Sequence, residues 1–363
     1  EIGWCDWSSD VCSSDLHAPQ QAVAIHSIQR IVSFLRIGKF QIPKEALEKT
    51  PKILGHRLRG LGADIFFDKA NQPEQVGRIG IGDDLLGDER IPLGVQSRKD
   101  DIQRGRSPDG YNEIVRRGGS PDMLMDFGII RLKTGQVYQN NEPLERVLLL
   151  VQGAVALEFA GQEKTIDRAN CFDSAPWVLS LPAGEPVRIT SLRDDTEFTY
   201  NATENERAFP PRLYAPEETP DEYRGAGTMK ETSTRIVRTT FNYTNAPYSN
   251  FVIGEVVGFP GKWSSYPPHH HPQPEIYYYK TMPEGGRAYA ELGDDAYKLR
   301  GNDTLLITEG LTHSHVTYPG YALWYLWVIR HLDGAPYITP TFVPEFKWVE
   351  APDAVIWPDK AEK

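Results

Sequence analysis

The sequence has 363 residues, carries a net charge of −11 at pH 7 and is 40% hydrophobic. That length is enough for two or more domains of ordinary size. An acidic balance without basic runs argues against a nucleic-acid partner, and no stretch approaches the roughly 20 apolar residues that a membrane-spanning helix needs. We therefore predict no nucleic-acid and no membrane partner, while homo-oligomerisation stays open.

The first sixteen residues, EIGWCDWSSDVCSSDL, resemble the conceptual translation of a sequencing adapter, and we interpret them as an assembly artefact. They lack the basic and apolar regions of a signal peptide. With Cys5 and Cys12 set aside in this way, Cys171 is the one cysteine left. A disulfide framework within the chain is then excluded, and a reducing, cytoplasmic setting is predicted.

Residues 17–106 differ in composition from the rest of the chain. The first tyrosine is Tyr111 and the first methionine is Met123. The net charge changes from about +4 over 17–106 to about −11 over 107–363. We predict that 17–106 is non-native or poorly structured, and we assign it no function.

From residue 126 onward the pattern is that of an all-β protein. Short β-branched and aromatic runs such as DFGIIRL, RVLLLVQG, EIYYYKT and ALWYLWVI alternate with Gly, Pro, Asn and Asp. Regular short strands of this kind predict a sandwich or barrel and not βαβ units. A Pro-rich, charged connection over 208–227 divides the pattern into two halves.

The two halves look like copies of one another, which predicts a duplicated domain. ERVLLLVQGAVALEFAG parallels EIYYYKTMPEGGRAYAELG, and WVLSLPAGEPVRIT parallels TLLITEGLTHSHVT. The match sets residues of the first half against residues of the second: Glu145 against Glu275, Gln139 against His269, Asn141 against His271, and Val187 against His313. The second half therefore has three histidines where the first has none.

The histidines of the second half predict a metal site. The chain has no histidine between His56 and His269. Residues two apart on a strand point to one face, so His269 and His271 can chelate together. Glu275 begins the next strand, and His313 follows a glycine turn further along. A purification tag or a solvated polar loop explains this set less well than one divalent ion, for which Zn²⁺, Mn²⁺, Fe²⁺ and Ni²⁺ are all suitable.

The pattern H-x-H-x₃-E followed by G-x-x-H resembles that of cupins, small β-barrels with a metal ion in the mouth. More narrowly, FPGKWSSYPPHHHPQPEIYYYK together with PGYALWYLWV resembles the 5-deoxy-glucuronate isomerase family of inositol catabolism. The resemblance covers about 107–345. It implies a bicupin, with two tandem barrels or jelly rolls and metal in the C-terminal one. The implied domains are a degenerate cupin with its connection over 107–245, a metal-binding cupin over 246–345 and a tail over 346–363.

The resemblance also implies an activity, the conversion of the small anionic sugar acid 5-deoxy-glucuronate to 2-deoxy-5-keto-gluconate. This aldose–ketose isomerisation would use one divalent ion per chain, with Zn²⁺ or Mn²⁺ placed before Fe²⁺ or Ni²⁺. Three alternatives stay open: the 5-keto-4-deoxyuronate isomerase of pectin breakdown, a cupin dioxygenase and a non-catalytic sugar-binding cupin.

The remaining candidates follow from position and charge. Tyr277 and Tyr279 share a strand face with Glu275, and both are candidate catalytic residues. His315 is a third candidate, as the base or as a rival for the fourth ligand, and a supporting role behind the ligands is its competing interpretation. Filling of the barrel core is the competing interpretation of the two tyrosines. A sugar acid needs a cation for its carboxylate, and the candidates are Lys262, Arg287 and Arg330. A surface ion pair is the competing interpretation of each of these.

Overall fold

The computed structural model describes residues 101–308 and 310–359, and these residues fall in one compact unit. The predictions for 1–16 and most of 17–106 lie outside the described residues. No helix in the described part of the chain is long and apolar enough to cross a membrane. The regular helices there are short 3₁₀ turns, η4 (Pro216–Glu218), η5 (Met229–Glu231) and η6 (Pro344–Glu350).

The first half is a jelly roll of nine strands, hereafter the N-terminal jelly roll. Its strands are β2 (Gly110–Val115), β3 (Asp126–Leu132), β4 (Val137–Asn140), β5 (Glu145–Phe159), β6 (Gln162–Arg168), β7 (Val178–Leu181), β8 (Val187–Ser191), β9 (Thr196–Thr203) and β10 (Arg212–Tyr214). The long strand β5 pairs with β7 and β9 along its first part and with β6 and β8 along its second. It bends at Gly153, where φ is +121° and a Cβ atom would lie 2.5 Å from Thr196. Only glycine meets both conditions without strain.

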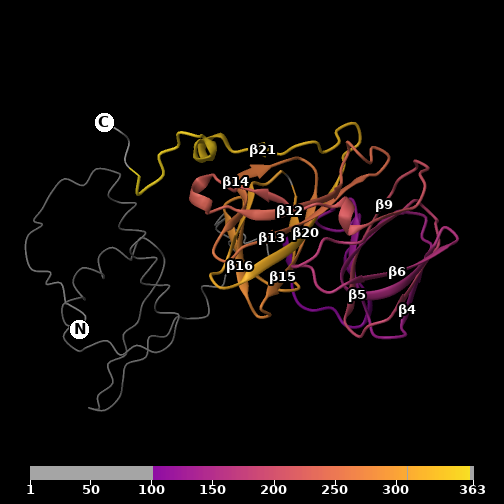
Figure 1. The fold of residues 1–363 in the computed structure, drawn as a ribbon. Coiled ribbons are helices and arrows are strands. Elements are labelled where there is room, and N and C mark those ends of the chain that lie inside the picture. Colours follow the sequence, from indigo (N-terminus) through magenta and orange to yellow (C-terminus); the bar gives the residue numbers. More distant parts are fainter. Residues whose placement is uncertain (1–100, 309, 360–363) are drawn as a thin grey trace, which may run out of the picture. The chain divides into compact units, whose positions relative to one another are not determined.

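The second half, hereafter the C-terminal jelly roll, is built from two sheets. The seven-stranded sheet runs β1-β18-β15-β20-β13-β12-β11, and the five-stranded sheet runs β17-β16-β19-β14-β21. The strands are β1 (Ile102–Gln103), β11 (Glu222–Arg224), β12 (Arg235–Phe241), β13 (Phe251–Gly258), β14 (Trp263–His270), β15 (Glu275–Met282), β16 (Arg287–Leu292), β17 (Asp295–Arg300), β18 (Thr304–Ile307), β19 (His313–Thr317), β20 (Ala322–Arg330) and β21 (Thr341–Phe342). Figure 1 shows both halves, with the strands of the first in purple to pink and most strands of the second in salmon to orange.

Apolar side chains gather in three clusters, one inside each jelly roll and one between them. On β5, Leu148 faces the interior of its own jelly roll whereas Leu149 packs in the cluster shared with the other half. On β15, Tyr277 and Tyr279 face inward and Tyr278 faces the partner half. Burial on both faces explains why these strands are near-continuous apolar runs without strict alternation.

Two buried ion networks also join the halves. Glu255 of β13 accepts bonds from Arg168 (2.6 Å) and Arg238 (2.9 Å). Glu197 of β9 binds Arg131, and it binds Lys280 of β15 at 2.5 Å. Because a buried charge is costly unless it is paired, these networks favour one arrangement of the two jelly rolls.

Two predicted boundaries do not follow the sheets. The prediction divides the halves at residue 245, whereas β11 and β12 pair with β13, so the sheets place the division after β10. The predicted start at residue 107 separates β1 from the edge of β18, with which it pairs. Arg104 also reaches Asp303 at 2.7 Å. Composition changes near 107, but backbone pairing does not depend on composition, so the folded unit includes 101–106.

Candidate metal centre

Three strands bring the predicted ligands together in the C-terminal jelly roll. His269 lies near the end of β14 and faces His313, the first residue of the neighbouring strand β19. Glu275 is the first residue of β15, and His271 lies in the short connection between β14 and β15. His313 therefore comes from the strand adjacent to that of His269.

Three of the four predicted ligands form one tight, buried cluster. Ligand atoms of His271, Glu275 and His313 all lie within 4.8 Å of one another. Nε2 of His271 is 3.0 Å from a carboxylate oxygen of Glu275, and Nε2 of His313 is 3.3 Å from the same oxygen. Two imidazoles converging on one carboxylate match the donor set of a first-row divalent metal ion.

The other nitrogen of each imidazole is held by the backbone. Nδ1 of His271 lies 3.0 Å from the carbonyl oxygen of Gln273, and Nδ1 of His313 lies 3.0 Å from that of Leu311. An Nδ1–H that donates to a carbonyl leaves a lone pair on Nε2, pointing at the cluster. Lone pairs facing a carboxylate repel it unless a cation lies between them. The cluster is therefore suited to a metal ion.

His269 is positioned beside this cluster as a fourth donor. Its ring centroid is 4.4 Å from that of His313 and 6.4 Å from that of His271. Its Nδ1 is buried, and among the described residues it has no hydrogen-bond partner. A buried polar atom without a partner is costly, so ligation of a metal ion would explain it.

The protonation states of the cluster suit metal binding. Burial, followed by repulsion from His313, lowers the pKa of His269 to about 3. Burial alone would raise the pKa of the Glu275 carboxyl. When protons and not a metal ion lie between the carboxylate and the Nε2 atoms of His271 and His313, their hydrogen bonds outweigh burial and lower that pKa. A neutral imidazole and an ionised carboxylate are the forms that bind metal ions.

The neighbouring His270 is not part of the cluster. It is half-buried, and its backbone pairs with Thr341 of β21. Residues adjacent on a strand point to opposite faces, which separates His270 from His269.

The candidate catalytic residues lie on the inner face of the C-terminal jelly roll. The Tyr277 ring lies 5.9 Å from His313 and 4.9 Å from His315. The Tyr279 hydroxyl is 2.7 Å from Nε2 of the fully buried His315, and Tyr325 stacks on that imidazole at 5.0 Å. Burial raises the pKa values of Tyr277 and Tyr279 well above the usual range, so both phenols stay protonated.

A cavity of about 300 Å³ adjoins the centre and is lined by His269, Glu275 and Tyr277. Its polar lining includes residues that the sequence analysis missed: Arg224, Arg235, Ser265, Tyr325 and Tyr337. The Tyr337 ring lies 4.9 Å from that of His271. The alternation in TRIVRTTF could have marked Arg235 as a strand residue, but the segment around Tyr337 carries no such signal.

None of the three predicted substrate-binding cations lines this cavity. Lys262 lies 4.0 Å from Glu231. Arg287 donates to the backbone of the turn before β16, and Arg330 contacts Thr203 and Asp333. Which cations reach the cavity depends on how β11 and β12 cross the C-terminal jelly roll. The distance of a residue from the histidines along the sequence did not indicate this.

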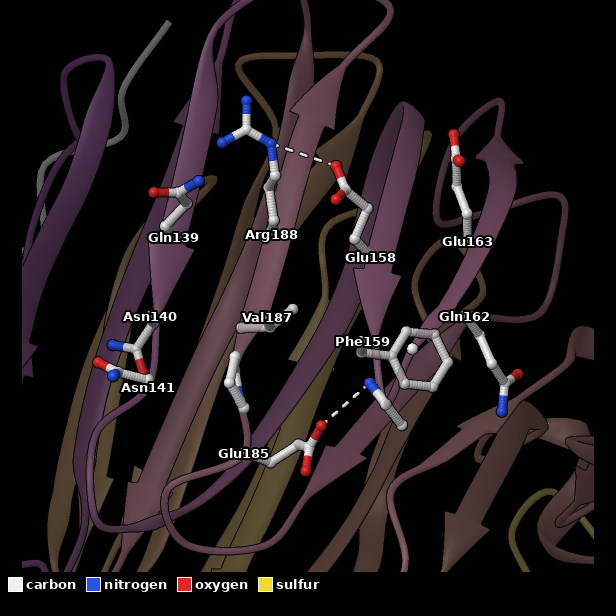
Figure 2. A pocket seen from close by; sticks show the side chains of 13 residues that line it. Gln139, Asn140, Asn141, Glu158, Phe159, Gln162, Glu163, Glu185, Val187 and Arg188 are labelled. Carbon is white, nitrogen blue, oxygen red and sulfur yellow. Dashed lines mark hydrogen bonds and ion pairs between the residues drawn. The ribbon is translucent and has the colours of Figure 1, made fainter.

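Strand pairing corrects the predicted match between the halves. In the C-terminal jelly roll His269 lies opposite His313, and in the N-terminal jelly roll Asn140 lies opposite Val187. The counterpart of His269 is therefore Asn140 and not Gln139. Figure 2 shows Asn140 and Val187 in a surface pocket of the N-terminal half, and no histidine is among the residues that line this pocket.

The same correction applies to the carboxylate. Glu275 pairs with Ile307, the last residue of β18, and Arg146 pairs with Leu181, the last residue of β7. Arg146 is thus the counterpart of Glu275, and Glu145 is not. The sequence match set Glu145 against Glu275 because both are glutamates. That match is shifted by one residue, and such a shift turns a strand side chain to the opposite face.

Glu145 and Arg146 have different environments. Glu145 faces the other half. The Asn205 side chain donates to it at 2.7 Å, and the backbone N–H of Asn250, in the other half, donates to it at 2.9 Å. The Arg146 guanidinium is fully buried and binds Oδ1 of Asn140 (2.8 Å) and the carbonyl oxygen of Glu185 (2.6 Å). A fixed cation occupies the place that the Glu275 carboxylate of the candidate metal centre has in the second half.

We therefore expect about one metal ion per chain, because a buried guanidinium repels a cation and amides are poor ligands for zinc-like ions. Elemental analysis of the purified protein measures this number. Asn140→Ala and Asn141→Ala should leave it unchanged. A content near two ions per chain, or a loss of metal in either variant, would contradict the assignment.

Two jelly rolls in tandem, with a histidine–carboxylate cluster inside the second, define a bicupin. Residues 106–349 match the KduI/IolB family. This match covers more than half of the chain, and the chain belongs to that family. The predictions of the fold class and the family are confirmed, and with them the prediction that the chain is an enzyme of the isomerase class.

Individual relatives agree with this family and fold. The 5-deoxy-glucuronate isomerase of Geobacillus kaustophilus is 27% identical over 243 residues, which are 61% of this chain and 85% of that protein. The crystal structure of an IolB-like protein from Salmonella typhimurium superimposes with a TM-score of 0.63 at 21% identity, covering 69% of this chain and 99% of the other. An oxalate decarboxylase from Lactobacillus farciminis, with a TM-score of 0.50 at 13% identity over 68% of this chain and 88% of its own, shares the fold.

Proposed function

We propose that this isomerase is metal-dependent and converts 5-deoxy-glucuronate to 2-deoxy-5-keto-gluconate in myo-inositol catabolism. The observation that carries the proposal is the cluster of His271, Glu275 and His313 beside the cavity. Relatives named 5-deoxy-glucuronate isomerase support the choice of substrate. A cavity of about 300 Å³ is at the small end of ligand sites and suits a six-carbon acid.

The metal ion would be held by His269, His271, Glu275 and His313. The orphaned Nδ1 of His269 and the converging Nε2 atoms support this ligand set. Imidazole and carboxylate ligands suit Zn²⁺ or Mn²⁺, with Fe²⁺ or Ni²⁺ as further candidates. When bound, such an ion polarises the carbonyl and hydroxyl oxygens of the sugar and acidifies the proton at C2.

The residues of the cavity would orient the sugar and assist the transfer of a proton from C2 to C1. Tyr277 lines the cavity and stays protonated, so its hydroxyl can donate a hydrogen bond to an oxygen on which negative charge develops. Behind it, the bond between Tyr279 and His315 holds two more buried rings in place. We assign Tyr277 to the reaction and Tyr279 and His315 to its positioning.

An assay of the full chain loaded with Zn²⁺ or Mn²⁺ tests the proposal. With 5-deoxy-glucuronate we expect a ketose to appear in the NMR spectrum, with incorporation of solvent deuterium at C1 where the proton exchanges. Turnover of 5-keto-4-deoxyuronate alone would favour the isomerase of pectin breakdown. Consumption of oxygen would indicate a dioxygenase, and sugar binding without turnover would indicate a binding protein.

A further inference from the structure

Two arginines that face each other line the cavity beside the metal cluster. Arg224 of β11 and Arg235 of β12 are directly opposite residues of an antiparallel pair. Both contribute to the wall of the cavity that Glu275 and His269 also line. Like charges at directly opposite positions destabilise a pair of strands, so this arrangement needs a compensating interaction.

The protein itself supplies little compensation for Arg235. Within residues 101–308 and 310–359, its guanidinium forms no ion pair, and Nη1 donates only to the carbonyl oxygen (2.9 Å) and hydroxyl (3.0 Å) of Ser233. Burial lowers the pKa of Arg235, and Arg224 acts in the same direction. By contrast, the buried Arg168 and Arg238 each bind the carboxylate of Glu255.

Arg224 has a partner, but an exposed one. Its Nη2 lies 2.8 Å from Glu222, and both side chains are about half exposed. A surface pair of this kind contributes little and exchanges readily with other partners. Arg224 can therefore turn to a ligand in the cavity at small cost.

We propose that Arg224 and Arg235 form a subsite for the carboxylate of a sugar acid whose other end reaches the metal cluster. This inference rests on the proposed function for the class of substrate. A planar guanidinium binds a carboxylate through two parallel hydrogen bonds, and an anion between two arginines removes their mutual repulsion. The subsite makes the cavity selective for acids over neutral sugars of the same size.

Calorimetric titration of the metal-loaded full chain with D-glucuronate and D-glucose tests the subsite without relying on turnover. We expect Arg235→Gln to weaken binding of glucuronate on the order of 10- to 100-fold, since a charged hydrogen-bond pair is lost, while binding of glucose stays within about twofold. The affinity of Arg235→Lys for glucuronate should lie between those of the unaltered chain and Arg235→Gln. Lysine keeps the positive charge but lacks the planar guanidinium that forms two parallel hydrogen bonds. Arg224→Gln should also weaken binding of glucuronate. Because this residue is exposed, that variant also serves if Arg235→Gln does not fold.

Arg193→Gln, which removes an equal charge from an exposed pair with Asp195, is the matched control and should bind both sugars like the unaltered chain. Metal content is measured on the same samples and should not change. Unaltered binding of glucuronate in Arg235→Gln and Arg224→Gln, or an equal loss for both sugars, would overturn the subsite. If 5-deoxy-glucuronate is not isomerised but glucuronate binding still depends on both arginines, the proposed reaction fails and the subsite stands.

Discussion

Replacement of His271 by alanine is expected to remove the metal ion and abolish isomerisation. His271 supplies one of two imidazoles that converge on Glu275, and its Nδ1 is held by the backbone. Loss of a partner that only orients a ligand costs 10- to 100-fold in metal affinity or activity, so loss of the ligand itself should lower kcat/KM by at least about 100-fold. His313→Ala should behave alike, although it lies 42 residues further along the chain. Elemental analysis and the isomerase assay measure both effects.

His270→Ala is the internal control for this experiment. The residue lies between His269 and His271, two of the proposed ligands, but it lies outside the cluster of His271, Glu275 and His313. Its removal should leave the metal content near normal and the activity within a few-fold, since alternation directs it away from the ligands. Loss of metal in His270→Ala together with retention in His271→Ala would show that the register of the ligands is wrong by one residue.

Replacement of Glu197 by glutamine is expected to lower the free energy of unfolding by about 3–5 kcal/mol. The Glu197 carboxylate binds Arg131 and Lys280 and accepts a bond from the Tyr278 hydroxyl at 2.8 Å. The amide would leave two cations without their anionic partner between the jelly rolls. Urea unfolding, followed by tryptophan fluorescence, measures the change.

Glu197 should also make the free energy of unfolding depend on pH. Burial alone would raise its pKa, but Lys280 and Arg131 outweigh burial and lower it. A carboxyl group with a lowered pKa in the folded state stabilises the fold at neutral pH, and this contribution is lost as pH falls through its folded value. The acid-induced loss of stability should therefore be smaller in Glu197→Gln than in the unaltered protein.

Glu158→Gln is the matched control for the stability measurement. Glu158 pairs with Arg188 at 3.2 Å, the ion pair that Figure 2 draws at the surface pocket, and both side chains are about half exposed. An exposed pair contributes about 0–1 kcal/mol. An equal loss of stability in the two variants would show that the network at Glu197 does not join the halves more strongly than a surface ion pair.

The sequence by itself determined the features that depend on short-range pattern. Strand alternation placed His269 and His271 on one face, and it placed Tyr277 and Tyr279 inward with Glu275. The repetition of strands predicted two similar halves, and residue type predicted which half carries ligands. These inferences need only the two-residue period of a strand and the chemistry of imidazole and carboxylate.

The tertiary structure alone decided which strands lie side by side and in which register. It placed Arg146, and not Glu145, at the position of Glu275, and it brought Arg224 and Arg235 into the cavity in place of the predicted cations. Pairing between strands that are distant in the sequence is fixed by packing of the whole core, and a shift of one residue reverses every face. Short-range pattern carries no information on that choice, because both registers have the same alternation.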